Sequence, residues 1–297
     1  MKRETFNATD GKVISIAVWE TENPKAVVQI SHGMSERIER YDDFAGYLSE
    51  KGFIVIGDDH RGHGKTDENA LGLAEEGKDL FASTVSDMAE LTDLAKERYN
   101  LPVLLLGHSY GSFLAQEYLQ KHSDKIIGCV LSGSALYSGF VSGFGKFVAN
   151  RKFKKHANEP GQFFANITFK SYDKHFGGTL NEWLSRNSES NEKYNADPFC
   201  GFTCSNGFYK YFFEHLNALA KGSFDSVKKE LPILVAYGSL DYVGDRGKLI
   251  KPLMKKLEKS GLKPVEKVYE GARHEILNET NRDEVYADIA DFFGSII

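Results

Sequence analysis

One pentapeptide constrains the fold of this chain more than any other stretch: Gly107-His108-Ser109-Tyr110-Gly111. A Gly-x-Ser-x-Gly pattern between a strand and a helix forms a sharp turn with the serine at its apex. The residues two before and two after the serine pass very close to each other there, so both must be nearly free of side chains, as Gly107 and Gly111 are. The pattern also fits an ordinary glycine-serine turn. The residues before and after it distinguish this turn from the sharp strand-turn-helix.

Those flanks favour the strained strand-turn-helix. The run 103–106 is continuously apolar, which is typical of a strand covered on both faces. Beyond the turn, small and apolar residues recur on one helical face, namely Gly111, Leu114, Ala115, Tyr118 and Leu119. The helix would direct its positive N-terminal end at Ser109.

The alternation of predicted elements indicates the fold class. Strands are predicted at 2–8, 13–20, 26–30, 53–57, 103–106, 126–131, 232–237 and 265–269, and helices at 41–51, 81–99, 110–122, 246–259 and from 281 onward. Asp10-Gly11 between the first two strands predicts an antiparallel hairpin. From the third strand on, the βα alternation predicts an α/β fold with a mostly parallel eight-stranded sheet and helices on both faces. Pro252 implies a kink or a later start in the helix at 246–259.

Residues 138–224 interrupt this alternation. They contain no apolar strand, and aromatic residues are mixed there with Gly, Asn, Lys and Ser. An insertion of this length beyond the carboxyl edge of a parallel sheet predicts a helical lid over the active site. The expected domains are therefore a core of residues 1–137 and 225–297 and a lid of residues 138–224.

Composition excludes several classes of function. The net charge of −5 gives no indication of nucleic-acid binding. No apolar stretch follows Met1-Lys2-Arg3, so we expect no signal peptide. No run is apolar enough to cross a bilayer and the three cysteines form no framework, so we expect a cytoplasmic protein. Cys200 and Cys204 lack a companion pair, which disfavours a zinc site. We predict no metal and no cofactor.

A serine hydroxyl becomes a nucleophile only when a base takes its proton and an acid orients that base. In this architecture both partners follow the serine along the chain, on loops after later strands. Asp241 follows the strand at 232–237, and His274 follows the strand at 265–269. We therefore predict Ser109, Asp241 and His274 as catalytic residues, with Asp245 as the substitute acid.

An oxyanion hole requires two backbone N–H donors. Tyr110, at the start of the helix, is expected to supply one. The other is expected from the loop after the third strand, where Gly33 lets the backbone turn inward and Met34 offers its N–H. Gly33 and Tyr110 are also predicted to contact the substrate. A plain glycine turn is the alternative interpretation of the Gly33 loop.

Other polar residues near these positions have structural interpretations. His60 and His63, in Asp-His-Arg-Gly-His-Gly, predict a self-bonded loop beside the serine turn, and a metal site is the less favoured alternative. His108 is expected to support the turn by hydrogen bonding. Glu275 is expected to support the loop that carries His274.

Five motifs together resemble the monoacylglycerol lipase and lysophospholipase branch of the α/β-hydrolase fold, a group related to the serine aminopeptidases. They are His32-Gly33-Met34-Ser35-Glu36 with Arg40-Tyr41, Asp58-x-x-Arg61-Gly62-His63-Gly64, Gly107-His108-Ser109-x-Gly111, Gly238-x-x-Asp241-x-Val243 and His274-Glu275-x-Leu277-Asn278-Glu279. The resemblance covers nearly the whole chain outside the predicted lid. It implies a nucleophile at Ser109, an acid at Asp241, a base at His274 and oxyanion donors at Met34 and Tyr110.

The chain departs from the family pattern at two positions. Tyr110 stands where the family commonly has methionine, and Ser112 stands where a second small apolar residue is usual. Both positions act through the backbone, so the expected chemistry is unaffected. The larger, polar-tipped Tyr110 is expected to narrow the choice of substrate near the acyl pocket.

The resemblance and the aromatic-rich insertion imply a serine hydrolase that cleaves carboxylic esters with an apolar acyl group. The expected substrates are a monoacylglycerol, a lysophospholipid or a related small acyl ester. The basic run at 151–155 in the lid predicts transient contact with an anionic membrane surface, although a solvated face is the commoner role of such a run.

Two other functions remain open at this point. A serine aminopeptidase would use the same three residues and would need acidic groups to hold a substrate ammonium; the candidates are Glu182, Glu189, Glu192 and Asp197. A non-catalytic binding protein on the same scaffold is less favoured, because such proteins usually lose one of the catalytic residues.

Overall fold

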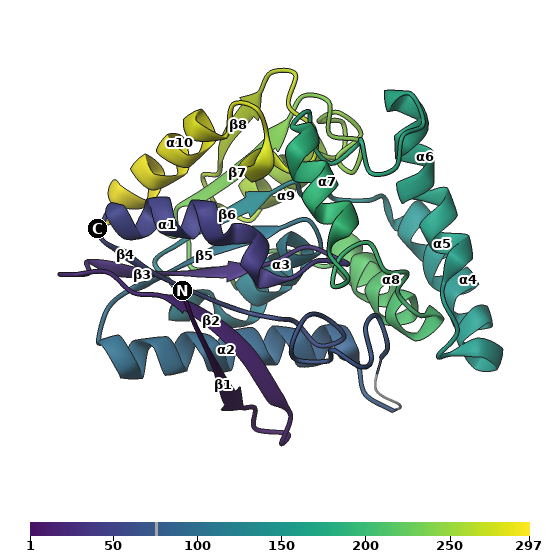
Figure 1. Cartoon of the computed structure of the whole chain (residues 1–297), viewed down its shortest axis with the longest axis horizontal. Helices are drawn as coiled ribbons and strands as arrows, with labels where there is room; N and C mark the ends of the chain where they lie inside the picture. Colours follow the sequence, from purple (N-terminus) through teal and green to yellow (C-terminus); the bar gives the residue numbers. More distant parts are fainter. Residues whose placement is uncertain (75–76) are drawn as a thin grey trace.

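A computed structural model describes residues 1–74 and 77–297 of the chain, apart from the side chains of Lys155 and Lys170. An eight-stranded sheet in the order β1-β2-β4-β3-β5-β6-β7-β8 runs through the molecule (Figure 1). Its strands are β1 (Lys2–Asn7), β2 (Val13–Trp19), β3 (Ala26–Ser31), β4 (Phe53–Asp58), β5 (Val103–His108), β6 (Gly128–Ser132), β7 (Ile233–Gly238) and β8 (Val265–Tyr269).

The direction of the strands follows from their connections. The hairpin turn at Gly11, which adopts φ +86°, makes β1 antiparallel to β2. β2 is also antiparallel to β4, whereas all pairs from β4 to β8 are parallel. Every residue of β3 to β7 is buried, because both faces of the parallel part are covered. The predicted α/β fold is therefore confirmed.

Two layers of helices cover the sheet (Figure 1). α1 (Asp42–Glu50) and α10 (Arg282–Gly294) pack on one face, and α2 (Leu80–Tyr99), α3 (Tyr110–His122) and α9 (Ile250–Lys259) pack on the other. The helix predicted at 246–259 begins only at Ile250. Pro252 lacks an N–H group and is tolerated only in a first helical turn, which accounts for the later start.

The segment between β6 and β7, which we call the insertion (residues 138–224), is helical. It contains α4 (Gly139–His156), α5 (Gln162–Ile167), α6 (Phe169–Asp173), α7 (Ser188–Ala196) and α8 (Asn206–Lys221). These helices lie beyond one end of the sheet (Figure 1). α4 approaches α8 closely at Gly145, where an added Cβ would lie 2.5 Å from the ring of Phe213. Among the described helices, none combines the length and apolar character needed to span a bilayer.

Candidate active site

The serine turn has the strained geometry that its sequence predicts. Ser109 lies between β5 and α3 with φ +53° and ψ −117°, a conformation that non-glycine residues rarely adopt. A Cβ added to Gly107 would lie 2.4 Å from the carbonyl oxygen of Gly111, and a Cβ added to Gly111 would lie 2.0 Å from that of Ser31. The close backbone packing thus requires glycine at both positions and holds the serine in place.

Ser112 has a role that the sequence did not indicate. Its hydroxyl lies 2.6 Å from the carbonyl oxygen of Ser109 and 2.9 Å from the hydroxyl of Ser134, and it is buried. The contacts tie the first turn of α3 to the loop after β6. The only signal in the sequence was that a serine stands where the family pattern has a small apolar residue.

The structure brings His274 and Asp241 together. Nδ1 of His274 lies 3.0 Å from Oδ1 of Asp241, which also accepts the backbone N–H of Val243 at 2.8 Å. Both side chains are buried. Burial alone would lower the pKa of His274, but the Asp241 carboxylate, with smaller contributions from Glu275 and Glu36, raises it above its ordinary value. His274 Nε2 has no hydrogen-bond partner in the part of the chain that the structure describes.

The insertion helps to hold the loop of residues 270–275, which carries His274 and which we call the histidine loop. The backbone N–H of Glu275 donates to the carbonyl oxygen of Leu184 at 2.7 Å. The ring of Trp183 packs on the ring of His274, with 5.0 Å between their centroids.

Gly133 and His108 complete the surroundings of His274. Gly133 follows β6 with φ +55°, and an added Cβ there would lie 2.9 Å from Cε1 of His274. The ring centroid of His108 is 4.8 Å from that of His274, and its Nδ1 lies 3.2 Å from the hydroxyl of Ser132. Burial, and then the proximity of His274, lowers the pKa of His108 to about 3, so it stays neutral. The predicted support by His108 is confirmed.

A buried ionic cluster connects the histidine loop to the loop after β3. The guanidinium of Arg40 donates to both carboxylate oxygens of Glu275, at 2.5 and 2.6 Å, and to Glu36 at 2.5 Å. Glu36 in turn accepts the backbone N–H of Gly33 and the hydroxyl of Tyr41. Burial disfavours ionised Glu275, yet Arg40 lowers its pKa to about 2. The expected support role of Glu275 is confirmed.

The loop that carries Met34 is fixed by a histidine. Nε2 of His63 accepts the backbone N–H of Ser35 at 3.1 Å. Burial lowers the pKa of His63 to about 3, so its ring stays neutral and can accept this bond. Met34 and Ser109 line the same cavities. Tyr110 is the first residue of α3, so its N–H is among the donors that the helix leaves unpaired.

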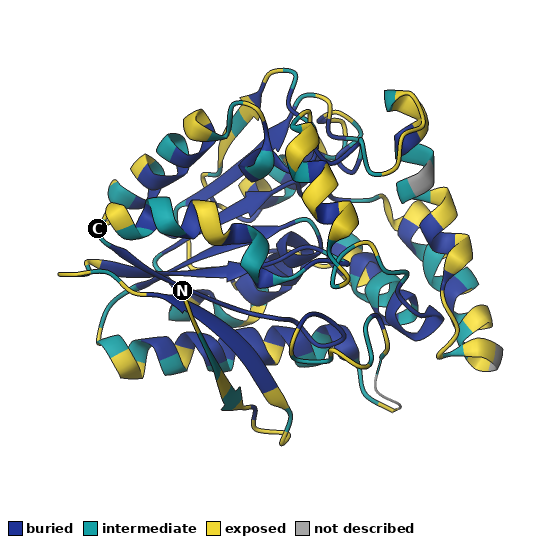
Figure 2. Cartoon of the chain, in the orientation of Figure 1, coloured by how far each residue is buried: buried dark blue, intermediate teal, exposed yellow. Residues whose placement is uncertain are grey.

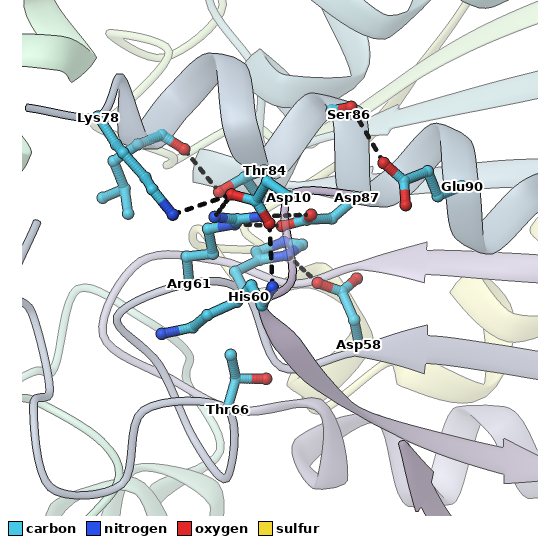
Figure 3. A network of polar contacts seen from close by, with 12 residues as sticks. Asp10, Asp58, His60, Arg61, Thr66, Lys78, Thr84, Ser86, Asp87 and Glu90 are labelled. Carbon is cyan, nitrogen blue, oxygen red and sulfur yellow. Dashed lines mark hydrogen bonds and ion pairs between the residues drawn. The ribbon is translucent and has the colours of Figure 1, made fainter. Parts of the chain in front are cut away.

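The remainder of the predicted self-bonded loop is shown in Figure 3. His60 contacts Asp58 through Nδ1 at 2.8 Å and Ser31 through Nε2 at 2.9 Å. Arg61 donates to Asp87 at 2.6 and 2.7 Å and to Asp10 at 2.8 and 2.9 Å, which joins the loop to α2 and to the β1–β2 turn. The self-bonded interpretation is confirmed. Within residues 1–74 and 77–297 no group of His, Cys, Asp or Glu side chains is arranged to hold a metal ion.

Two cavities meet at Ser109, and they differ in character. The first, which we call the polar cavity because its wall contains ionisable side chains, has a volume of about 200 Å³. Its wall includes Gly33, His274 and Asp173, together with apolar residues such as Trp183 and Leu184. The apolar cavity has a volume of about 270 Å³. Its wall includes the side chains of Tyr110, Phe113, Phe144, Phe164, Ile167, Phe212, Phe213 and Leu216. Met34, Ser109 and Phe169 line both.

The other acidic candidates lie away from both cavities. Asp245, the substitute acid, pairs with Lys248. Of the residues considered for binding an ammonium group, Glu182 pairs with Arg273, Glu189 with Lys193 and Asp197 with Arg37, and Glu192 is exposed. None of the four contributes to the described wall of either cavity. Three of the four thus form ion pairs with other side chains, and the fourth, Glu192, faces solvent.

Comparisons with known proteins find an aminopeptidase family model and, among individual proteins, lipases and esterases. A family model described as "Serine aminopeptidase, S33" matches residues 22–281. Monoglyceride lipase of Homo sapiens is 29% identical over 273 residues, which cover 91% of this chain and 82% of that protein. Phospholipase YtpA of Bacillus subtilis is 26% identical over 272 residues, covering 90% and 95%. A carboxyl esterase structure from Bacillus coagulans superposes with a TM-score of 0.88 at 27% identity, covering 99% and 98% of the two chains.

Proposed function

We propose that this chain, which belongs to the serine aminopeptidase S33 family, hydrolyses monoacylglycerols, lysophospholipids or related small acyl esters. The predicted resemblance to the monoacylglycerol lipase branch and the α/β-hydrolase fold are confirmed. The relatives are named monoglyceride lipase, phospholipase and carboxyl esterase, and the chain is a carboxylic ester hydrolase. Which residues catalyse the reaction and which ester is cleaved are what we propose.

The contact between His274 and Asp241, beside a serine held at φ +53°, carries the proposal. In the proposed mechanism, His274 takes the proton of Ser109 as its hydroxyl attacks the ester carbonyl, and Asp241 holds the imidazole in the required tautomer. The backbone N–H groups of Met34 and Tyr110 stabilise the oxyanion. His274 then protonates the leaving alcohol and activates the water that releases the acid.

The positions of the two cavities indicate which cavity holds the acyl chain of the ester and which holds its alcohol. The leaving alcohol must lie next to His274, which gives it a proton, and His274 lines the polar cavity only. The acyl chain is therefore assigned to the apolar cavity. Tyr110 lines that apolar wall, in agreement with its expected influence on the acyl group.

This assignment disfavours an aminopeptidase. The residue released by an aminopeptidase carries its ammonium on the acyl side of the scissile bond. The described wall of the apolar cavity contains no charged side chain, so an ammonium there would be desolvated without a partner. A non-catalytic binder would have no need of the buried contact between Asp241 and His274.

The mouth of the apolar cavity supports the proposed role of the insertion as a lid that contacts lipid. Phe144, Phe163 and Ile167 line this cavity and are also exposed at the surface. The helices that carry them, α4 and α5, have both buried and exposed residues (Figure 2). Phe140 on α4 is 85% exposed, and basic residues follow on the same helix. A patch of this kind suits the surface of an anionic membrane. Within the predicted basic run, the side chain of Lys155 lies outside the described residues.

Hydrolysis of p-nitrophenyl esters from acetyl to palmitoyl tests the proposal. We expect the wild type to prefer a medium or long acyl chain and Ser109→Ala to lose activity to the level of buffer. Aminoacyl-arylamides serve as the comparison substrates, and we expect no turnover of them. Ester cleavage by Ser109→Ala at the wild-type rate, or cleavage of arylamides alone, would contradict the proposal.

A further inference from the structure

The proposed chemistry places a positive charge in the protein interior. When His274 takes the proton of Ser109, its imidazole becomes an imidazolium, and this residue is only 1% exposed. A buried charge costs free energy unless protein groups compensate it. The groups that surround the ring of His274 therefore affect the rate of the reaction.

The ionised groups near His274 include three carboxylates. Burial lowers the pKa of His274, but the Asp241 carboxylate, 3.0 Å from Nδ1, raises it above its ordinary value. Glu275 and Glu36 act in the same direction, and Arg40 pairs with both of them. Asp241 meets the imidazole at its edge, which leaves the faces of the ring for other contacts.

An aromatic ring of the insertion lies against the imidazole. The ring centroids of Trp183 and His274 are 5.0 Å apart, and the ring planes are inclined by 32°. Rings this close and this nearly parallel overlap in part, because rings side by side in one plane would have centroids farther apart. His108, a second neighbouring ring, has its centroid 4.8 Å from that of His274 and stays neutral. The face of an indole carries partial negative charge and attracts a cation within about 6 Å of its centroid.

Contacts with the histidine loop hold Trp183 in this position. Its side chain is buried, and the residues on either side of it pair with the histidine loop. Glu182 forms an ion pair with Arg273 at 2.8 Å. The carbonyl oxygen of Leu184 accepts the N–H of Glu275 at 2.7 Å. The indole is thus in place before the charge forms, so little reorganisation is needed during the reaction.

We propose that Trp183 is a positioning residue that stabilises the imidazolium form of His274 through the face of its indole ring. A neutral imidazole is attracted less, so the contact is stronger in the transition state than in the ground state and accelerates the reaction. The inference rests on the proposed function, because that function makes His274 the base. It gives the insertion a part in the chemistry that is separate from a role as a lid.

Fluorinated tryptophan tests the inference while nearly preserving the shape of the side chain. Ring fluorine withdraws electron density from the indole face and weakens its attraction for a cation. We expect kcat/KM for p-nitrophenyl butyrate to fall stepwise with one, two and three ring fluorines, by about threefold or more in total.

The second tryptophan of the chain, Trp19, provides the matched control. In Trp19→Phe only Trp183 carries fluorine, and the dependence on fluorine should remain. In Trp183→Phe only Trp19 carries fluorine, and the dependence should disappear. Trp183→Leu, which packs without an aromatic face, should have a lower kcat/KM than Trp183→Phe.

The pKa of His274 gives a second readout that uses no ester. NMR of the histidine Cε1 resonances measures it, with His274→Gln to assign the signal. The pKa should fall with each added fluorine, because the imidazolium loses attraction while Asp241, Glu275 and Glu36 are unchanged. A merely structural role of Trp183 would leave both kcat/KM and this pKa constant across the fluorine series.

A constant kcat/KM or a constant pKa across the series, or an equal dependence on fluorine in Trp183→Phe, would overturn the inference. Failure of the proposed function would look different. The unlabelled wild type would then cleave no p-nitrophenyl ester, and the inference would fail with it.

Discussion

Two acidic residues follow β7 within a few positions, and the fold separates their roles. Asp241 is fully buried, and Val243 N–H and His274 fix its carboxylate. Asp245 adopts φ +43° and pairs with Lys248 at the surface. Only the first residue can hold the imidazole of His274 in one tautomer.

Replacing each acid by its amide tests this difference. We expect Asp241→Asn to lower kcat for p-nitrophenyl butyrate by about 10⁴-fold, because an amide favours the wrong tautomer of the histidine. Asp245→Asn is the matched control and should change kcat less than about twofold. Similar losses in both variants would show that the acid is misassigned.

The pH dependence of kcat/KM should report His274. As the proposed base, His274 must be unprotonated, and its pKa is raised, so activity should fall as pH falls through a midpoint above the ordinary value of about 6.5. Glu275 contributes to the raised pKa, so Glu275→Gln should move the midpoint to lower pH. Glu270→Gln, an exposed neighbour on the same loop, should leave the midpoint in place. A wild-type midpoint below 6 would contradict the assignment of the base to His274.

Among the helices, one histidine of the insertion makes polar contacts with two helices of the core. His215 on α8 stacks on Phe81 of α2, with 4.4 Å between ring centroids. Its Nε2 lies 2.9 Å from Asp79, at the start of α2, and its Nδ1 contacts Glu117 of α3. Burial opposes protonation, but the two carboxylates raise the pKa of His215 to about 9. Protonated His215 thus joins three helices.

The stability that His215 provides should depend on pH. A pKa raised in the folded state gives stabilisation that is fully present below about pH 6.5 and is lost as pH rises through 9. The shift corresponds to at most about 3 kcal/mol. His215→Gln should therefore lower Tm by several degrees at pH 6.5 and have little effect at pH 10, whereas the exposed His156→Gln should be neutral at both. A constant Tm difference across this range would refute the charge-based explanation.

Arg40 joins two loops of the core in a similar way, the loop after β3 and the histidine loop. Removing one member of a buried ion pair leaves the other uncompensated, at a cost of about 3–5 kcal/mol. Urea unfolding should show a loss of this size for Arg40→Ala, which strands Glu36 and Glu275. Arg282→Ala breaks an exposed pair with Asp43 and should cost less than about 1 kcal/mol. Equal losses would mean that the Arg40 cluster does not hold the two loops together.

At the scale of the whole molecule, the exposed aromatic face of α4 lies at the mouth of the proposed acyl cavity. Phe140→Ser, Phe144→Ser and Phe147→Ser combined should weaken binding to phosphatidylglycerol vesicles by at least about tenfold, because each Phe buries apolar area in the lipid. Val13→Ser with Val265→Ser removes exposed apolar side chains elsewhere and is the control. Sedimentation with vesicles measures both, and equal binding by all proteins would exclude this face as the contact.

The sequence predicted what depends on neighbours along the chain. The serine turn could be recognised because Gly107 and Gly111 satisfy a local steric demand, and strands alternated with helices in order. Trp183, Gly133 and the partner of Glu275 could not be predicted, because they meet His274 or Arg40 only after the insertion and distant loops fold together. Glu182, Glu189 and Asp197 were considered as ammonium ligands for the same reason, since their ion-pair partners are not evident in the sequence.

Peptide mass mapping after reaction with a fluorophosphonate tests most directly whether Ser109 is the residue that becomes acylated. We predict one adduct, on the peptide that contains Ser109, together with complete loss of ester hydrolysis. His274→Ala should slow labelling by orders of magnitude, because the proposed base is missing. An adduct on a different serine, or full ester hydrolysis by a protein labelled at Ser109, would show that Ser109 is not the nucleophile.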